Sequence, residues 1–362
     1  MIALISVILY IGVFIISVTI LNKGIVDKKM FNIITIIALI IPILLATVRY
    51  NVGTDYFNYM REFNNVNNIS FYEYLSSNGI FEIGNFTINK IANIFNNYTI
   101  VLAINSILAL IPIYVSINNH INKIKISVAI SMFIYLCIYF PLSLNLMTQF
   151  IAIGFVAIAY KYIFEKEPLK FTVMIFIASL FHTTALIILP IYFLWNKKKD
   201  RIISKWKVFV VILICLTIVL NYQVILQWVS NIGPFNDYAI YVEARTKGAN
   251  KDIYIKLLLF IIVFIFRKKL IKIDKRNELY ILLIGLNLII GLTGYTSPWI
   301  KRIAIYFEIT QIFILPSFIN FMRNKRDRSI IVLIICLYSI FYFILVYYIL
   351  RQANIIPYRI LL

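Results

Sequence analysis

The 362-residue chain is 62% hydrophobic and only 14% charged, and its mean hydropathy is +0.90. This composition excludes a water-soluble globular domain and indicates a polytopic membrane protein. The net charge of +20 could suggest nucleic-acid binding. However, most of the lysines and arginines lie in six short connectors between apolar runs, at 22–30, 118–125, 161–170, 196–207, 267–278 and 322–329. We therefore expect no nucleic-acid partner, and a lipid bilayer instead.

Apolar runs of about 17–25 residues, long enough to cross a hydrocarbon core of roughly 30 Å, recur along the whole chain. Such runs are too long for barrel strands, and helices bond their own backbone groups inside lipid. We therefore expect an all-α fold, a polytopic transmembrane helical bundle in which 1–362 form a single integral membrane domain. About ten full spans are expected, at 2–21, 31–48, 99–117, 126–141, 145–163, 208–227, 253–266, 279–297, 303–321 and 330–350.

The basic connectors also predict which side each loop occupies, because cytoplasmic loops carry an excess of lysine and arginine. The first span has no basic residue ahead of it and is followed by Lys23. It is therefore not a cleavable signal peptide, and the N-terminus is expected outside. Placing all six basic connectors inside puts the loops 49–98 and 228–252 and the C-terminus on the extracytoplasmic side.

One segment, 171–195, does not fit a simple count of crossings. Basic connectors flank it on both sides, yet twenty-five residues cannot cross the membrane twice. Either the charge pattern is misleading here, or the segment is a re-entrant hairpin that turns near "FHTT". We favour the hairpin, because it restores agreement with the charge pattern at every later loop.

The stretch "VRYNVGTDYFNYMREF", residues 48–63, concentrates polar groups directly after the second span. Asn51 and Gly53 predict a tight turn, and Thr54 or Asp55 could cap a following helix. Capping does not explain why Arg49, Asp55 and Tyr59 lie so close together at the mouth of the bundle, where a cleft is expected.

The exterior is otherwise poor in basic residues, so its arginines are candidates for anion binding rather than topology signals. A guanidinium presents a fixed fork of donors that suits a phosphate or diphosphate. The candidates are Arg49, Arg61, Arg245, Arg302 and Arg351.

Several motifs, taken together, resemble the EpsG family of bacterial exopolysaccharide proteins, which is related to the Wzy polymerases of O-antigen and capsule pathways. The motifs are "VRYNVGTDYFNY", "FEIGNFTINKI", "NLMTQFIAIGFVAIAYKYIFEKEPLKF", "ASLFHTTALIILP" and "KRIAIYFEITQIFILP". They cover about residues 40–320, and the first and the "FH" element are the most specific. One departure is Thr148, where the pattern "RQ" would place an arginine before Gln149.

This resemblance implies a metal-independent glycosyltransferase-type polymerase in the bacterial plasma membrane. It would join undecaprenyl-diphosphate-linked oligosaccharide repeat units on the outer face, without a cofactor and beside a flippase and a chain-length regulator. Outward-facing arginines would stabilise the diphosphate leaving group. Clustered His, Cys or Asp residues with metal-ligand spacing are not found in the sequence, and Cys137, Cys215 and Cys336 show no pairing pattern.

A polymerase of this kind needs a general base for the acceptor hydroxyl, and the candidates are His182, Asp55 and Glu82. His182 lies mid-segment, where an ionisable group is costly and usually functional. The alternative is a neutral imidazole that bonds a neighbouring helix. The second histidine, His120, lies in a basic connector and is expected to be solvated.

The remaining candidates lie on the later spans. Glu308 could pair with Lys301 or with a basic residue of another helix. Arg302 and Tyr306 are four apart and share a helical face, which offers a charge and an aromatic floor to a sugar phosphate. Gln149, with Asn145 on its face, could contact substrate or form interhelical hydrogen bonds. The expected substrate-binding set is Arg49, Tyr59, Arg61, Arg245, Arg302, Tyr306 and Gln149.

Two other functions stay open at this point. A flippase or transporter of lipid-linked oligosaccharide would also be a helical bundle, but broken helices in matching halves are expected there. A multi-spanning acyltransferase that modifies surface glycans would need a catalytic histidine or acid near a cytoplasmic acyl donor. The polar residues lie mostly on the expected exterior, which favours extracytoplasmic glycan chemistry.

Overall fold

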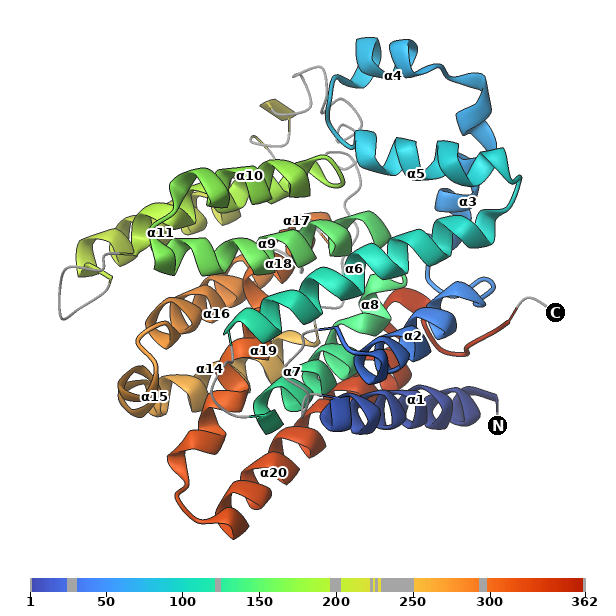
Figure 1. Cartoon of the computed structure of the whole chain (residues 1–362). Helices are drawn as coiled ribbons and strands as arrows, with labels where there is room; N and C mark the ends of the chain where they lie inside the picture. The colour runs from blue at the N-terminus through green and yellow to red at the C-terminus, as the bar shows by residue number, and fades with distance from the viewer. Residues whose placement is uncertain are drawn as a thin grey trace.

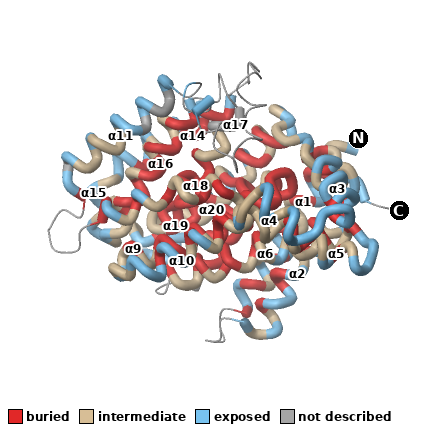
Figure 2. The backbone as a smooth tube through the Cα atoms, turned by 90° about the horizontal axis from the view of Figure 1, so that it is seen from above, coloured by how far each residue is buried: buried red, intermediate tan, exposed pale blue. Residues whose placement is uncertain are grey.

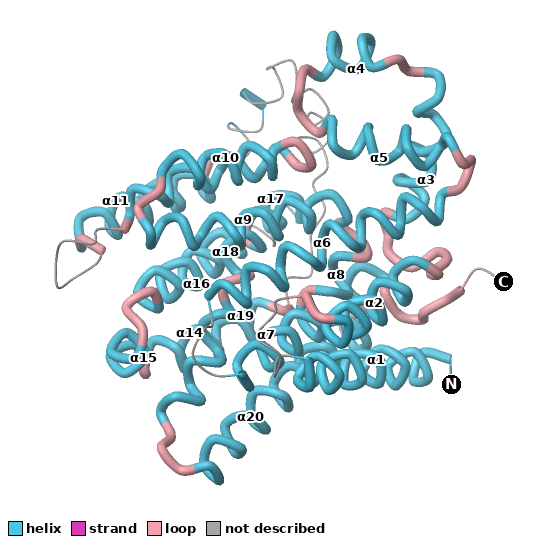
Figure 3. The backbone as a smooth tube through the Cα atoms, viewed as in Figure 1, coloured by secondary structure: helices cyan, strands magenta, loops and turns pink. Residues whose placement is uncertain are grey.

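The computed structural model describes residues 2–24, 31–120, 125–195, 203–221, 224, 227–228, 251–292 and 298–360. Within these ranges the regular elements are helices, and β-pairing is limited to one isolated bridge between Arg49 and Ile360 (Figure 3). The all-α prediction is therefore confirmed for the described part of the chain.

The long helices of the bundle follow the apolar runs of the sequence (Figure 1). They are α1 (Ile2–Gly24), α2 (Ile33–Thr47), α6 (Tyr98–His120), α7 (Lys125–Ile138), α9 (Met147–Glu165), α11 (Lys205–Leu220), α14 (Ile253–Ile265), α16 (Asn277–Gly291) and α20 (Lys325–Phe343) with its π-helical continuation η6 (Ile344–Ile349). The span after α16 is divided into α17 (Pro298–Ile303), α18 (Ile305–Glu308), α19 (Gln311–Ile314) and η5 (Leu315–Phe321).

Shorter helices connect these spans. The segment between α2 and α6 contains α3 (Tyr56–Asn65), η1 (Val66–Asn68), α4 (Phe71–Asn78) and α5 (Ile83–Ile94). Elsewhere the connections contain α8 (Phe140–Ser143), α10 (Pro168–Ser179), η2 (Thr183–Leu194) and α15 (Arg267–Ile273), and the C-terminal tail contains η7 (Gln352–Asn354).

Among the described residues, five helices are long and apolar enough to cross a membrane: Ile2–Gly24, Tyr98–His120, Met147–Glu165, Lys301–Phe321 and Lys325–Ile349. Six further apolar helices of 10–17 residues are present, and the count of ten spans stays a prediction. In the most apolar 18 residues of Lys301–Phe321, 78% of the positions are buried, whereas the corresponding share in Lys325–Ile349 is 28%. The former therefore lies at the centre of the bundle and the latter at its rim, and Figure 2 shows exposed segments surrounding a buried middle.

Both ends of the chain lie at the same end of the bundle as the start of the 49–98 loop (Figure 1). The Tyr50 amide donates to the carbonyl of Arg359 at 2.9 Å, and the Tyr358 amide donates to Ser6 Oγ at 2.9 Å. The C-terminal tail is therefore fixed against α1 and the loop. The tail and the start of the loop thus lie at one end of the bundle, and the side of the membrane stays a prediction.

Residues 168–194 form two helical arms, α10 and η2, which pack against each other. The base of the hairpin is closed by Lys166, whose ammonium group donates to the carbonyl of Trp195. At the tip, the Gly84 amide donates to the carbonyl of Leu180 at 2.8 Å. A Cβ at Gly84 would lie 2.6 Å from the Phe181 ring, so glycine permits this close approach. The hairpin thus meets the 49–98 loop at its turn.

The expectation that His120 is solvated is wrong. Helix α6 continues to this residue, which buries the ring, and Nδ1 lies 2.8 Å from the carbonyl oxygen of Ser116. The imidazole stacks on Phe313 with 4.4 Å between ring centroids. The basic connector 118–125 therefore did not indicate where helix α6 ends, since its last turn is still buried at His120.

Candidate functional site

A cavity of about 290 Å³ opens at the end of the bundle where the 49–98 loop and the C-terminal tail lie. Five stretches of the described chain contribute to its walls, so tertiary folding assembles it from residues far apart in sequence. Its lining comprises Thr54, Ile138, Tyr139, Leu142, Asn145, Leu146, Asp252, Lys256, Lys301, Arg302, Ile305, Glu308, Tyr342, Tyr347, Leu350, Gln352 and Ala353.

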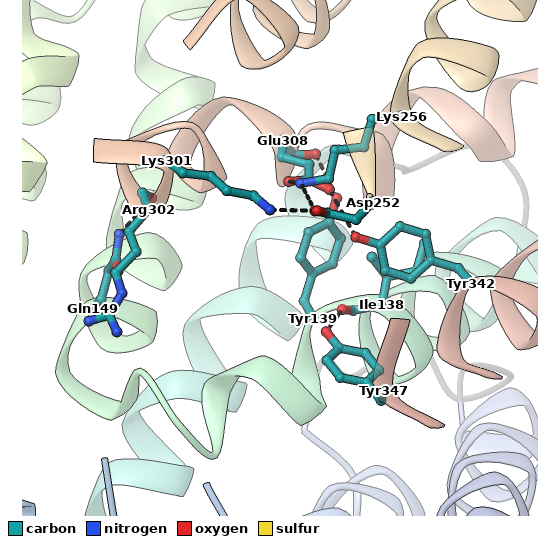
Figure 4. A network of polar contacts seen from close by, with 10 residues as sticks. All are labelled: Ile138, Tyr139, Gln149, Asp252, Lys256, Lys301, Arg302, Glu308, Tyr342 and Tyr347. Carbon is teal, nitrogen blue, oxygen red and sulfur yellow. Dashed lines mark hydrogen bonds and ion pairs between the residues drawn. The ribbon is translucent and has the colours of Figure 1, made fainter. Parts of the chain in front are cut away.

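Four charged side chains form what we term the inner cluster: Asp252, Lys256, Lys301 and Glu308 (Figure 4). The Lys256 ammonium lies 2.7 Å from Glu308 Oε2 and 3.1 Å from Asp252 Oδ2. The Lys301 ammonium lies 2.5 Å from Asp252 Oδ1. Each lysine therefore faces a carboxylate, as buried charges require.

Burial of Asp252, which precedes α14, would raise the pKa of its carboxyl, but Lys256 and Lys301 outweigh this effect. The pKa of Asp252 is lowered to about 2. The carboxylate is therefore ionised at physiological pH.

Tyrosines form the wall beside the inner cluster. The Tyr342 hydroxyl donates to Glu308 Oε1 at 3.4 Å, and the Tyr139 hydroxyl donates to the Glu308 carbonyl at 2.7 Å. The Tyr347 hydroxyl donates to the carbonyl of Ile138 at 2.5 Å. These contacts fix three aromatic rings at the cavity wall (Figure 4).

At the mouth of the cavity, Asp55 of the 48–63 stretch lies beside Arg302. Arg302 Nη2 lies 3.4 Å from Asp55 Oδ2, and the Arg302 side chain is 30% exposed. Asp55 occupies the N-cap position of α3, yet its side chain makes no capping hydrogen bond. The carboxylate instead faces Arg302 and the amide of Asn145. The alternative that Asp55 is only a helix cap is therefore wrong.

Asn145 fixes the turn that carries Asp55. Its Oδ1 accepts from the Asp55 amide at 2.9 Å and from the Thr54 hydroxyl at 3.0 Å. Gly53 has φ of +101°, and a Cβ there would lie 3.1 Å from Asn145 Oδ1. The glycine of the "VGTD" motif is thus required for both the backbone conformation and the close approach.

Gln149 and Tyr59 lie around the same mouth. The Gln149 amide donates to the carbonyl of Arg302 at 2.9 Å, and a side-chain hydrogen bond joins Tyr59 to Thr148. Gln149 thus makes the interhelical hydrogen bond that was expected of it, whereas Asn145 bonds the turn before α3. Thr148, where the family pattern suggests an arginine, contacts the loop helix α3 instead.

The three predicted acid–base candidates fall into two places. Asp55 lies at the mouth, whereas His182 Nδ1 lies 3.2 Å from Glu82 Oε1. Glu82 Oε1 also accepts from the amide and the hydroxyl of Thr183, each at 3.2 Å. Partial burial opposes ionisation of Glu82, but the contacts from His182 and Thr183 outweigh it, so the pKa of Glu82 is lowered.

Tyr306 connects the hairpin to the central span. Its hydroxyl lies 3.1 Å from the hydroxyl of Thr184, and its carbonyl accepts from Tyr160 at 2.8 Å. The ring is completely buried and does not line the cavity. The aromatic floor expected from Tyr306 is therefore supplied at the cavity by Tyr139, Tyr342 and Tyr347.

The other predicted arginines lie in different surroundings. Arg49 is 2% exposed, and its guanidinium donates to the carbonyls of Ala46 and Leu144, which secures the junction of α2 with α8. Arg61 and Arg351 are exposed, and Arg245 lies outside the described residues. The structure thus brings Arg302 to the cavity, and does not bring Arg49 or Arg61 there.

Sequence reasoning missed Asp252, Lys256 and Tyr342. A signal for the first two was present, since Lys256 is an ionisable residue inside an apolar span and Asp252 precedes it by one helical turn. Tyr342 carried no signal, because the chain holds 25 tyrosines. Among the described residues no group of three or more His, Cys, Asp or Glu side chains could hold a metal ion.

Comparison of the sequence with known protein families shows to which family the chain belongs. The EpsG family matches residues 32–360, nearly the full chain and more than the motifs alone covered. The chain belongs to the EpsG family. Membership makes it a membrane protein of the exopolysaccharide-related, Wzy-like type. No curated protein and no solved structure matches the chain.

Proposed function

We propose that this EpsG-family protein polymerises lipid-linked oligosaccharide repeat units at the outer face of the bacterial plasma membrane. The observation that carries the proposal is the cavity mouth, where Arg302 faces Asp55 at 3.4 Å on the side of the bundle that holds the long loop. A partly exposed guanidinium beside a carboxylate offers the two groups that glycosyl transfer from a diphosphate requires.

In this reaction the hydroxyl oxygen of one repeat unit attacks the anomeric carbon of another. A new glycosidic C–O bond forms, and the bond between that carbon and the diphosphate oxygen breaks. Undecaprenyl diphosphate leaves with the bonding electrons, and Arg302 stabilises its charge. The hydroxyl proton passes to a general base.

Two positions can supply this base. Asp55 is adjacent to Arg302, so that an acceptor hydroxyl next to the leaving group would lie near its carboxylate. The alternative is His182 oriented by Glu82, which repeats the arrangement of a base held by a carboxylate. Arg49 then acts as a positioning residue, because its contacts with Leu144 and Met147 fix the turn beside Asn145.

The partners follow from the reaction. The substrate is an undecaprenyl-diphosphate-linked glycan that a flippase has delivered, and a chain-length regulator would act on the product. The topology expected from the basic connectors, with both termini outside, supports the proposal, because the cavity would then face the side on which this reaction takes place.

The deciding experiment is the size and sidedness of lipid-linked glycan in a strain that lacks this gene and any second polymerase. Loss of a polymerase leaves single repeat units outside the cell. Loss of a flippase traps the units inside, and loss of an acyltransferase keeps chain length while it removes a substituent. A normal ladder of long chains in the deletion strain would contradict the proposal. Purified protein should then join isolated lipid-linked units in detergent.

A further inference from the structure

The charges of the cavity are unevenly distributed. Among the described residues of its lining, five are charged, and the two lysines of the inner cluster balance its two carboxylates. The fifth is Arg302, which lies at the mouth and faces Asp55. Within this lining, the positive charge that no lining carboxylate balances is therefore that of Arg302, whose counter-charge Asp55 lies beside the lining.

A balanced cluster is poorly suited to an anion. An anionic group in the inner cavity would have to displace Asp252 or Glu308 from Lys256 or Lys301 at 2.5–3.1 Å. The displaced carboxylate would then be buried without its partner, which is strongly unfavourable. A diphosphate is therefore better accommodated at Arg302, whose contact with Asp55 is long and partly exposed.

The same cluster is well suited to a sugar ring without charge. Each sugar hydroxyl both donates and accepts, so it can bridge an ammonium group and a carboxylate without breaking their pairing. The Tyr139, Tyr342 and Tyr347 side chains add aromatic surface and hydroxyls. A volume of about 290 Å³ lies just below the usual range of ligand pockets, about 300 to 1,000 Å³, and suits a small part of a glycan.

We propose that the inner cluster with Tyr342 is a subsite that selects an uncharged sugar, the one bonded directly to the diphosphate held at Arg302. This inference rests on the proposed function and adds a substrate class to it. The repeat unit that the enzyme consumes then begins with a sugar that carries neither carboxylate nor phosphate. The glycosyltransferase that initiates the unit must transfer such a sugar phosphate to the lipid.

Matched glycosides test the inference on the purified full-length protein in detergent. Methyl glucoside and methyl galactoside differ from methyl glucuronide and methyl galacturonide only by the carboxylate, and saturation-transfer NMR measures their binding. We expect at least one neutral glycoside to bind about tenfold more tightly than its acidic counterpart. Binding of neither neutral glycoside, or equal binding within both pairs, would overturn the proposal.

Variants of the cluster locate the selectivity. Asp252→Asn and Glu308→Gln each remove one negative charge, so both should shift the ratio of neutral to acidic binding by about tenfold toward the acidic glycoside. Tyr342→Phe should weaken the neutral glycoside and leave the ratio unchanged. Thermal unfolding in detergent identifies variants that fold. An unchanged ratio in the folded charge variants would refute the subsite.

The two proposals fail separately. If the deletion strain shows that repeat units are not joined by this protein, the polymerase is refuted. If the units are joined but neutral and acidic glycosides bind equally, or the charge variants leave their ratio unchanged, only the subsite is refuted. Arg61→Lys, at an exposed position that does not line the cavity, serves as the matched control and should leave the glycoside ratio unchanged.

Discussion

Glu82 and His182 meet at 3.2 Å, although one comes from the loop between α2 and α6 and the other from the turn of the α10–η2 hairpin. Two hydrogen bonds from Thr183 hold the same carboxylate oxygen. The turn of the hairpin therefore places His182 against the 49–98 loop, which also contains Asp55. Two of the three acid–base candidates are thereby joined as one unit.

Substitution of His182 separates catalysis from packing. His182→Gln keeps a polar group of similar reach but no longer accepts a proton, so polymer formation by the purified protein should fall about 10²–10⁴-fold if His182 is the base. Asp55→Asn should cause a loss of that size if Asp55 is the base. Glu73→Gln, an exposed acid in the same loop, is the control and should have wild-type activity. A fully active His182→Gln variant would leave a structural role only.

The lowered pKa of Glu82 predicts a pH dependence of stability. Since the folded pKa lies below the ordinary value of 4.5, the ionised carboxylate stabilises the fold. This contribution is fully present above the unfolded pKa and is lost as pH falls through the folded pKa. Thermal unfolding of wild type and Glu82→Gln should therefore differ at pH 7 and converge as the pH falls below 4.5 and through the folded pKa. A constant difference between the two proteins would contradict the assignment.

Arg302→Lys tests recognition of the diphosphate. Lysine keeps the charge but loses the guanidinium fork, so the rate of joining should drop by about 10–100-fold while the protein remains folded. Arg61→Lys is the matched control, because Arg61 is exposed and does not line the cavity. If Arg302→Lys is as active as Arg61→Lys, the guanidinium of Arg302 is not needed for the reaction.

Arg49→Lys should act on stability. The guanidinium bonds two carbonyl oxygens and contacts Met147 Sδ at 3.0 Å, and lysine cannot satisfy all three. We expect a loss of about 1–3 kcal/mol in the free energy of unfolding. Thermal unfolding in detergent measures it. If the variant is as stable as wild type but inactive, Arg49 instead binds the substrate.

The sequence predicted the all-α character of the described part of the chain because the length and apolar composition of a helix are local properties. The number of spans and the side of each loop stay predictions. The sequence also indicated Asp55, Glu82, His182 and Arg302 as functional candidates. It could not show which side chains meet, because pairing depends on tertiary packing. Glu308 illustrates this limit: of its two expected partners, the basic residue of another helix is found, Lys256 at 2.7 Å. Lys301 pairs with Asp252 instead.

His120 and Arg49 show a second limit. Both stand beside polar or basic residues in the sequence, yet both are buried. Helix continuation buries His120, and the loop after α8 covers Arg49 through the carbonyl of Leu144. Neither burial is visible in the composition of the neighbouring residues.

Single cysteines, in a background that lacks Cys137, Cys215 and Cys336, can show whether the hairpin returns to the side from which it enters. The base of the hairpin is closed by Lys166 and Trp195, so the segments before and after it should lie on one side. Exposed positions Lys170 and Ser204 test those segments, Lys269 marks the basic side, and Asn67 marks the side of the long loop.

An impermeant thiol reagent applied to intact cells should label a cysteine at position 67 and leave those at 170, 204 and 269 unlabelled until the membrane is opened. The physical reason is that two short arms joined at Phe181 and His182 return the chain to the side it came from. Labelling at 204 from outside, with 170 protected, would mean that 171–195 crosses once. All later loops would then change sides, and Arg302 would lie on the cytoplasmic face, where the proposed reaction cannot occur.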